Sequence, residues 1–529
     1  MNCRICGNSE LKKILSLGSS PLANNLSKKE EAGREEKYPL ELLFCGKCKL
    51  VQLGHIMEPD VLFRNYLYVT STTKTFQQHF TQMAEDVCKR YGLGKGSLAV
   101  DIGSNDGLLL KGFAKIGLSV TGVEPAVNLA KLANESGVET INDYFNQRAV
   151  NEILRTKGKA AVITATNVFA HVNDIKTLTQ DVKTLMKDDG TFIIEAPYLP
   201  DMLEKMTFDA IYHEHLSYFS LMPLDTFFSS MGMKITDVQH VDSHGGSLRV
   251  FVQKQGRQED SVSRMLEGEK AKGIDSEDTY RQFAEKAYAN REKLVQLVKS
   301  LREQGCKVAG YGAPAKATTL LNFCGLGKEE IEYVVDDNPM KVGLYIPGTG
   351  IPIVKSERLE TEKPDYLIIL AWNFANEIIG KTGHLAEKGV RLIIPVPTPR
   401  IALGGNEKIT MIKPAFADAR GEITNVIEQP VSHIAVIKSA KGSIRGNHYH
   451  PEQEQYVYLI TGSYESISKE MKTGRVEKVN VEAGDLVHTP PMIAHAMKFL
   501  EDSIMLNITT GNRDANKFGE HTKKYQVTL

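Results

Sequence analysis

Four of the seven cysteines stand in two pairs with the same spacing, Cys3-x2-Cys6 and Cys45-x2-Cys48. Two such pairs allow two tight turns to wrap one tetrahedral Zn²⁺ with four thiolates. Because four sulfur ligands leave no open coordination position, we predict a structural zinc rather than a catalytic one. Buried or redox-active cysteines are the alternative interpretation.

A glycine-rich turn at residues 103–107 separates an apolar run from a helical pattern. Glycines there let the backbone approach a ligand at the carboxyl end of a strand, where a doubly wound sheet binds its cofactor. Glu124 ends the next apolar run and can accept hydrogen bonds from two ribose hydroxyls. These positions predict a nucleoside-containing cofactor.

The spacing Asp-x-Gly-x-x-x-Gly, which begins at Asp101, resembles the first motif of the S-adenosylmethionine methyltransferases. A dehydrogenase is the alternative. The resemblance implies that Asp143 lies where that family contacts the adenine and that Asn167 lies where it holds the methionine end. The predicted cofactor-binding residues are Asp101, Gly103, Asn105, Gly107, Glu124, Asp143 and Asn167.

The segment 211–220 holds two imidazoles, one carboxylate and two phenols. Such a concentration of polar groups is unusual in a core element and favours general acid–base chemistry. Metal binding and a solvated loop remain alternative interpretations.

These motifs need several folded units to position them. At 529 residues the chain is too long for one core. Its 64 basic and 65 acidic residues nearly cancel, which does not favour nucleic acid or a membrane surface as the main partner. The N-terminus lacks the apolar stretch of a signal peptide, and no apolar run approaches the ~20 residues that span a bilayer. The few cysteines fit the reducing cytoplasm, which is the predicted location.

The pattern of the chain changes three times. Residues 1–70 are rich in turn formers and carry the cysteine pairs, and strand-like runs then alternate with helical patterns from 71 to 255. A charged stretch at 259–292 predicts one long helix or two, followed by a second strand–helix alternation. After Gly404-Gly405-Asn406, which we interpret as a linker, short strands separated by turns predict a β-barrel or sandwich.

Residues 1–405 together resemble the sugar C-methyltransferases of deoxysugar pathways. The resemblance rests on the cysteine pairs, the methyltransferase turn, Tyr-His-Glu-His at 212–215, His-Gly-Gly-Ser-Leu-Arg at 244–249, Gly-Tyr-Gly-Ala-Pro-Ala-Lys at 310–316 and Asp-Asp-Asn-Pro at 336–339. That family acts at C3 of thymidine-diphosphate 4-keto-6-deoxy sugars, and its C-terminal domain helps to hold the nucleotide sugar. The substrate-binding residues implied here are His244, Gly245, Ser247, Arg249, Tyr311, Lys316 and Asn338. The turn at 310–313 could also be read as a nicotinamide site, but it lacks the third glycine.

Methylation of carbon beside a ketone needs a base and donors that stabilise the enolate. His215 is the predicted base, because an imidazole pKa near 6.5 suits proton abstraction at neutral pH. Tyr212 is expected to donate to the C4 oxygen, and Glu214 to orient His215 or a sugar hydroxyl. Tyr66 or Tyr68 is expected to close over the site, as the family's N-terminal tyrosine does.

The segment 406–529 resembles the cupins through Gly442-x5-His448-x-His450-x3-Glu454 and Gly484-x5-Pro490-x4-His495. His448, His450, Glu454 and His495 occupy the positions that ligate a metal in many cupins. The segment also resembles the metal-free 4-keto sugar epimerases and ketoisomerases, which implies His448 as a base and Arg445 as a substrate contact. A divalent metal, metal-free catalysis and a purely structural barrel all remain open.

The predicted fold class is a multidomain α/β protein: a zinc-binding domain at 1–70, a Rossmann-like methyltransferase domain at 71–255, a second Rossmann-like α/β domain at 256–405 and an all-β cupin barrel at 406–529. We predict a bifunctional enzyme that methylates C3 of a nucleotide-linked keto sugar with S-adenosylmethionine and epimerises C5 or C3. The alternatives are a methyltransferase with a structural or metal-binding cupin, a 3,4-ketoisomerase activity in the cupin, an O- or N-methyltransferase, and a catalytically inactive sugar-nucleotide sensor. A homodimer through the cupin is a further expectation.

Overall fold

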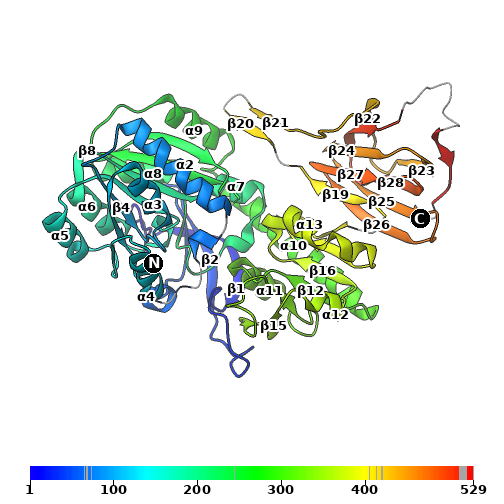
Figure 1. Ribbon diagram of the computed structural model, residues 1–529, viewed down its shortest axis with the longest axis horizontal. Helices are drawn as coiled ribbons and strands as arrows, with labels where there is room; N and C mark the ends of the chain where they lie inside the picture. Colours follow the sequence, from blue (N-terminus) through cyan, green and yellow to red (C-terminus); the bar gives the residue numbers. More distant parts are fainter. Residues whose placement is uncertain are drawn as a thin grey trace. The chain divides into compact units, whose positions relative to one another are not determined.

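The computed structural model describes residues 1–64, 66, 69–72, 74–243, 245–403, 406–412, 414–418, 421–511 and 521–527. The chain forms two compact units (Figure 1). The first unit contains Met1–Asn25, Arg34–Ala289 and Thr318–Phe323, and the second contains Leu26–Gly33, Asn290–Ala317 and Cys324–Leu529. Tyr68 and His244, two of the predicted site residues, lie outside the described residues.

The first unit begins with a four-stranded antiparallel sheet in the order β1-β2-β3-β9. Its strands are β1 (Leu11–Ser20), β2 (Tyr38–Cys45), β3 (Val51–Leu53) and β9 (Ser217–Tyr218). Alternate residues of β2, Leu40, Leu42 and Phe44, are buried, as expected for a strand with one face toward a core. The fourth strand comes from the polar segment 211–220, so the cysteine-bearing sheet is joined directly to that segment.

The second sheet of this unit has seven strands in the order β10-β11-β8-β7-β4-β5-β6. Five are mutually parallel: β4 (Leu98–Ile102), β5 (Ser119–Val123), β6 (Thr140–Ile141), β7 (Ala160–Thr166) and β8 (Met186–Pro197). The antiparallel strands β10 (Lys234–Val241) and β11 (Ser247–Gln253) complete one edge. The alternation of strands and helices predicted for residues 71–255 is confirmed.

Helices cover both faces of the seven-stranded sheet, which explains why its parallel strands are continuously apolar. On one face, α2 (Lys74–Tyr91) and α3 (Leu108–Ile116) contribute Phe80, Met83 and Phe113 to a buried cluster. On the other face, α5 (Gln147–Thr156), α6 (Ile175–Leu185) and α8 (Leu221–Ser230) contribute Ile153, Val182 and Phe227. A further helix, α4 (Val127–Glu135), follows β5.

The charged stretch predicted as one helix or two forms α9 (Asp260–Ala271) and α10 (Glu277–Glu303). The second strand–helix alternation follows. Its parallel strands are β13 (Val334–Val335), β15 (Ile351–Val354), β12 (Val308–Tyr311), β16 (Tyr366–Ile369) and β17 (Arg391–Ile394), with helices α11 (Ala315–Cys324), α12 (Arg358–Thr361) and α13 (Ala375–Glu387).

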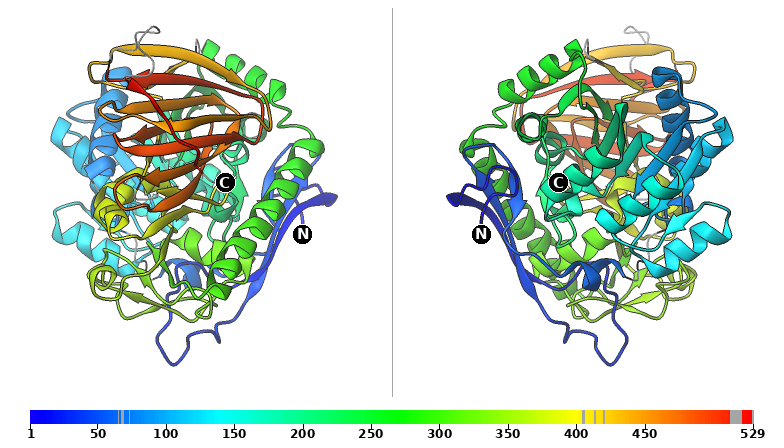
Figure 2. Two further views of the ribbon diagram at one scale, coloured as in Figure 1. Left: turned by 90° about the vertical axis from the view of Figure 1, so that its right-hand side faces the viewer. Right: turned by 90° about the vertical axis from the view of Figure 1, so that its left-hand side faces the viewer.

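The C-terminal part of the second unit is a barrel of two facing antiparallel sheets, whose orange to red strands run side by side in Figure 2. One sheet contains β19 (Lys408–Met411), β27 (Asp485–Thr489), β24 (Gln455–Thr461), β29 (Ser503–Thr509) and β22 (His433–Ser439). The other contains β26 (Val476–Glu482), β25 (Ser463–Glu470), β28 (Ile493–Phe499), β23 (Ile444–Tyr449) and β30 (Lys523–Lys524). Val457, Leu459, Tyr464, Met497 and Phe499 fill the space between them.

The predicted linker is wrong at Asn406, which is built into the barrel. Its side chain donates to the carbonyls of Ser468 and Arg475, and only 1% of its surface is exposed. The strand β18 (Arg400–Leu403) pairs with both β17 and β19, so one sheet continues from the α/β part into the barrel. Among the described residues, no helix is long and apolar enough to cross a membrane.

Candidate functional site

The four paired cysteines converge in the first unit. Their Sγ atoms all lie within 4.8 Å of one another, with Cys3 and Cys48 3.4 Å apart and Cys6 and Cys45 3.5 Å apart. Each pair sits in a tight turn closed by backbone hydrogen bonds, from Gly7 to Cys3 and from Lys49 to Cys45. The hydrogen bond with Cys48 holds the pKa of Cys3 well below its usual range. Four thiols that converge in this way fit a tetrahedral zinc ion.

The glycine-rich turn lies at the carboxyl end of β4. Gly103 has a φ of 64°, and a Cβ there would stand 2.4 Å from a methyl group of Val168, so only glycine fits. Both oxygens of Glu124 are anchored by backbone amides, from Asn105 and from Ala126, each at 2.8 Å. Burial raises the pKa of Glu124, against the effect of these two amides. The carboxylate is therefore fixed beside the turn.

The other predicted cofactor residues differ in their surroundings. Asp101 accepts a hydrogen bond from Thr164 across the sheet, and burial raises its pKa to about 7. Asp143 is paired with Arg148. Asn167 follows β7 in a left-handed conformation, with a φ of 57°. Asp101 thus ties β4 to β7, whereas Asn167 lies at the carboxyl edge, where a cofactor is expected.

The segment between the two sheets connects the cofactor turn to the polar segment 211–220. The backbone N–H of Thr70 donates to the side chain of Asn105. Tyr66 exchanges two hydrogen bonds with Asn128 of α4, and its hydroxyl donates to Glu214 at 2.7 Å. Tyr66 therefore joins the cofactor region to the predicted catalytic residues.

Glu214 is held by residues far away in the sequence. Asn24 donates to one carboxylate oxygen at 2.6 Å and Tyr66 to the other. Only 3% of the residue is exposed, and this burial raises its pKa. The sequence analysis expected Glu214 to orient His215 or a sugar hydroxyl, and the structure shows the carboxylate fixed by Asn24 and Tyr66.

The ring of His215 is oriented by a backbone carbonyl. Nδ1 lies 2.8 Å from the carbonyl oxygen of Ala210, and because a carbonyl can only accept, Nδ1 carries the proton in the neutral ring. The lone pair of the neutral imidazole is consequently on Nε2. The ring of Tyr212 lies against it, with centroids 4.0 Å apart.

His171 also belongs to this cluster and was missed by the sequence analysis. Its ring stacks on that of His215, with centroids 5.1 Å apart. The ring of His171 also lies nearly parallel to that of Phe63, with centroids 5.6 Å apart. The signal in the sequence that could have identified it was a histidine four residues after Asn167, near the carboxyl end of β7. His213, by contrast, is 1% exposed beside Tyr38 and His55, and burial lowers its pKa.

The described part of the segment 244–249 turns inward. The hydroxyl of Ser247 donates to the carbonyl of Ser243, and Arg249 pairs with Glu195 at 2.8 Å. Glu195 also contacts His79 at 2.8 Å. Burial favours a higher pKa for Glu195, but His79 and Arg249 outweigh it and hold that pKa at about 2. Substrate contacts by Gly245, Ser247 and Arg249 stay predictions.

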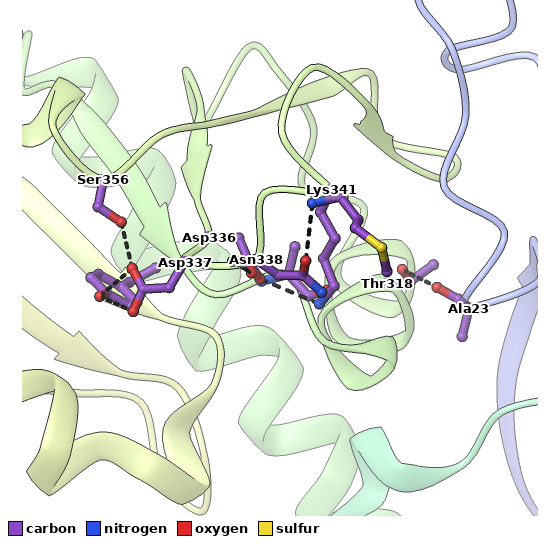
Figure 3. Close-up of polar contacts among 10 residues, drawn as sticks. Ala23, Thr318, Asp336, Asp337, Asn338, Lys341 and Ser356 are labelled. Atoms are coloured by element: carbon purple, nitrogen blue, oxygen red, sulfur yellow. Dashed lines mark hydrogen bonds and ion pairs between the residues drawn. The ribbon is translucent and has the colours of Figure 1, made fainter. Parts of the chain in front are cut away.

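In the second unit, polar groups gather at the carboxyl ends of β12 and β13 (Figure 3). Asp336 accepts from the N–H groups of Ala313 and Asn338, which holds the turn after β12 against β13. Asp337 accepts from Ser356 at 2.6 Å and from Tyr311 at 3.1 Å. Beside this turn, the ammonium group of Lys316 lies 4.8 Å from the ring centre of Trp372. Tyr311 thus ends β12, Lys316 lies in the first turn of α11, and Asn338 follows β13.

The barrel brings three of the four predicted metal ligands together. The rings of His448, His450 and His495 have centroids 4.8 to 6.1 Å apart. Glu454 instead accepts from the hydroxyl of Tyr456 and lies 3.6 Å from His488. Among the described residues, only the four cysteines form a group with metal-binding geometry.

Strand alternation explains why Glu454 lies apart. In β24 the inward residues are Gln455, Val457 and Leu459, so the residue after Glu454 takes the interior position. The side chain of Gln455 lies 3.0 Å from Nε2 of His450 and donates to Asn507. Glu454 therefore does not join the three histidines in this structure, and the four-ligand metal site stays a prediction. Arg445 is engaged with Ser439 and with the carbonyl of Lys438.

Comparisons with known proteins assign family models to most of the chain. Residues 3–63 match a zinc binding domain, 76–238 a methyltransferase domain, 242–397 the C-methyltransferase C-terminal domain, and 416–514 a polysaccharide biosynthesis C-terminal domain. The four cysteines thus lie in a zinc-binding domain.

One curated relative and two solved structures each match a part of the chain. A ubiquinone biosynthesis O-methyltransferase of Colwellia psychrerythraea is 32% identical over 117 residues, 21% of this chain and 46% of that protein. A dTDP-4-dehydrorhamnose 3,5-epimerase from Sulfolobus tokodaii is 22% identical, with a TM-score of 0.20, over 23% of this chain and 78% of its own. A double mutant of the QdtA 3,4-ketoisomerase from Thermoanaerobacterium thermosaccharolyticum is 20% identical, with a TM-score of 0.20, over 23% of this chain and 89% of its own.

The C-methyltransferase NovU of Streptomyces niveus is 41% identical over 403 residues, which are 75% of this chain and 96% of that protein. Together with the three family models over residues 3–397, this identity shows that the chain belongs to the C-methyltransferase family.

Proposed function

We propose that the protein transfers a methyl group from S-adenosylmethionine to C3 of a nucleotide-linked 4-keto-6-deoxy sugar. The observation that carries this proposal is the orientation of His215, whose Nδ1 is bound to a carbonyl while Nε2 keeps the basic lone pair. This base stands in the same unit as the cofactor turn, and Tyr66 connects the two through Asn128 and Glu214.

The chemistry follows from these groups. Nε2 of His215 removes the proton from the carbon beside the ketone, and the electron pair moves onto the ketone oxygen. The phenol of Tyr212 is the proposed donor to that oxygen, because a developing enolate needs a hydrogen bond there. Bound S-adenosylmethionine supplies an electrophilic methyl group. The buried carboxylate of Glu214 and the phenol of Tyr66 are suited to binding a sugar hydroxyl next to the reacting carbon.

Within the second unit, Tyr311, Lys316 and Asn338 are the proposed contacts for a sugar nucleotide. Tyr311 ends β12, Asn338 follows β13 and Lys316 lies in the helix after β12, near the carboxyl ends of parallel strands, where open α/β sheets bind their ligands. The Lys316 ammonium group offers a positive charge for a diphosphate.

The base is tested by His215→Asn in the full chain. We expect turnover to fall by about 100-fold or more, with little change in cofactor affinity, since only the proton acceptor is lost. Product NMR after incubation with S-adenosylmethionine and 4-keto sugar nucleotides would locate the new methyl group. His213→Asn is the control, because that ring faces Tyr38 and His55. Near-normal turnover by His215→Asn, or a methyl group on oxygen or nitrogen, would refute the proposal.

A second activity in the barrel is proposed on a separate observation: three imidazoles gather in the interior, next to amides rather than to a carboxylate ligand. We propose that His448 removes a proton beside the ketone and that the barrel epimerises C5 or C3 without a metal. A 3,4-ketoisomerase or a structural barrel are the competing functions. The homodimer and the cytoplasmic location stay predictions.

A further inference from the structure

Arg4 lies between Cys3 and Cys6 in sequence, yet its side chain extends toward the segments that carry His171 and His215. Only 9% of Arg4 is exposed. Its guanidinium donates to the carbonyl of Leu216 at 2.9 Å, to the carbonyl of Leu53 at 3.2 Å and to the side chain of Asn173 at 3.1 Å. All of these residues belong to the first unit.

The acceptors place Arg4 between the two segments that carry the histidine pair. Leu216 follows His215 directly in the chain, and Asn173 lies two residues after His171. The rings of His171 and His215 are stacked at 5.1 Å. One planar side chain therefore fixes the segment of the proposed base and the segment of its stacking partner at the same time.

The environment of Arg4 shows that this fixation is its main interaction. The three acceptors are neutral groups, two backbone carbonyls and one amide oxygen. A buried guanidinium costs free energy unless its donors are used, and here they are used on loop carbonyls and one amide.

We propose that Arg4 is a positioning residue for methyl transfer, which transmits the rigidity of the zinc-binding turn to His215 and His171. The short pairing of β3 with β9 supports the same connection, since the N–H of Leu53 also donates to the carbonyl of Leu216. The zinc-binding domain thereby does more than stabilise the N-terminus. This inference rests on the proposed role of His215 as the base.

The test uses Arg4→Met and Arg4→Lys in the full chain. We expect Arg4→Met to lower kcat by roughly 10- to 100-fold with little change in the affinity for S-adenosylmethionine, because small displacements of catalytic groups have effects of that size. Arg4→Lys, which keeps the charge but not the fork of donors, should restore only part of kcat. Zinc content should stay at the wild-type value in both variants.

Two further variants separate positioning from general stability. Asn173 is exposed, so Asn173→Ala is not expected to unfold the protein. The variant should lower kcat by a few fold, because the hydrogen bond from Arg4 to Asn173 is lost. Asn151→Ala is the matched control: Asn151 is an exposed asparagine of α5 in the same unit, and turnover should remain normal.

The decisive comparison is made in the His215→Asn background. If Arg4 acts through the base, Arg4→Met should cause little further loss there, because the group it positions is already gone. An equal loss in both backgrounds, or wild-type kcat in Arg4→Met and Asn173→Ala, would overturn the inference. Normal turnover of His215→Asn alone would instead refute the proposed base, so the two failures are distinguishable.

Discussion

Neighbouring residues of the same type have different roles because their surroundings differ. His213 and His215 are two positions apart, but His213 is enclosed by Tyr38 and His55, whereas His215 is oriented by the carbonyl of Ala210. Similarly, Glu124 is held by backbone amides beside the cofactor turn, while Glu214 is held by the side chains of Asn24 and Tyr66. A residue's chemistry at this scale follows from its hydrogen-bond partners.

At the residue scale we predict that Glu124→Ala weakens binding of S-adenosylmethionine by about 10-fold or more, since hydrogen bonds to a charged group are lost. Binding of the sugar nucleotide should change little. Isothermal titration of each ligand measures both effects. Glu139→Ala is a suitable control, because Glu139 is exposed and paired with Lys157. Equal weakening of both ligands would show that Glu124 does not contact the cofactor.

Elements far apart in sequence are held together by a few buried polar groups. β9 adds the segment 217–218 to the sheet of the cysteine turns. Glu195 of β8 pairs with Arg249 of β11 and also contacts His79 of α2. Because Glu195 is fully buried, its charge is tolerated only with these partners. Such contacts fix the loops that carry the site.

The zinc-binding turns give the first prediction at this scale. The double variant Cys45→Ser, Cys48→Ser should lose the one zinc per chain and become less stable rather than merely inactive, since metal binding and folding are coupled. Metal analysis of the purified protein and thermal unfolding would measure the two effects. Native protein that holds no zinc would contradict the prediction.

The Glu195–Arg249 ion pair gives the second prediction at the scale of elements. Arg249→Met should lower the free energy of unfolding by roughly 3–5 kcal/mol, because it leaves a buried carboxylate without its cation. In the wild type the low pKa of Glu195, about 2, contributes stability above about pH 4 that is lost as the pH falls toward 2. The variant should therefore lose less stability on acidification.

Denaturant unfolding at neutral and acidic pH would measure the difference for the Glu195–Arg249 pair. Lys131→Met, at the exposed pair with Glu135, should change stability by less than about 1 kcal/mol. A neutral effect of Arg249→Met would show that the buried pair is not needed for stability.

At the scale of the whole molecule, the barrel is not an appendage on a flexible linker. β18 and β19 continue the sheet of the α/β part into the barrel, and Arg400 forms a buried ion pair with Asp485. Glu407 is buried between Ser466 and Thr489 inside the barrel. A fragment cut at residue 405 would sever this sheet, so the barrel is best studied in the full chain.

The corresponding prediction concerns hydrogen exchange. If His448 acts as a base, the full-length protein should exchange deuterium from heavy water into a 4-keto sugar nucleotide without S-adenosylmethionine, even in the His215→Asn background. His448→Asn should stop this exchange, while methylation continues with unaltered configuration at the second carbon. A chelator should have no effect on the barrel, given the position of Glu454. Mass spectrometry and NMR would follow both reactions, and exchange at the solvent rate would reduce the barrel to a structural module.

Spacing along the chain determined the features that depend on local geometry. The cysteine pairs, the glycine turn after β4 and the predicted strands could be recognised because a tight turn, a positive φ or an apolar run leaves a local pattern. The family resemblance over residues 1–405 followed from the order of these patterns and agrees with the 41% identity to NovU.

Only the tertiary structure decided which side chains meet. His171 and His215, Asn24 and Glu214, and Arg4 and Leu216 are each brought together by sheets and loops that close over long stretches of sequence. The barrel shows the same limit within one motif, since counting residues selected Glu454, whereas the start of β24 places Gln455 inward. Sequence spacing names the candidates, but strand phase and long-range packing decide where each side chain points, because these depend on the whole fold.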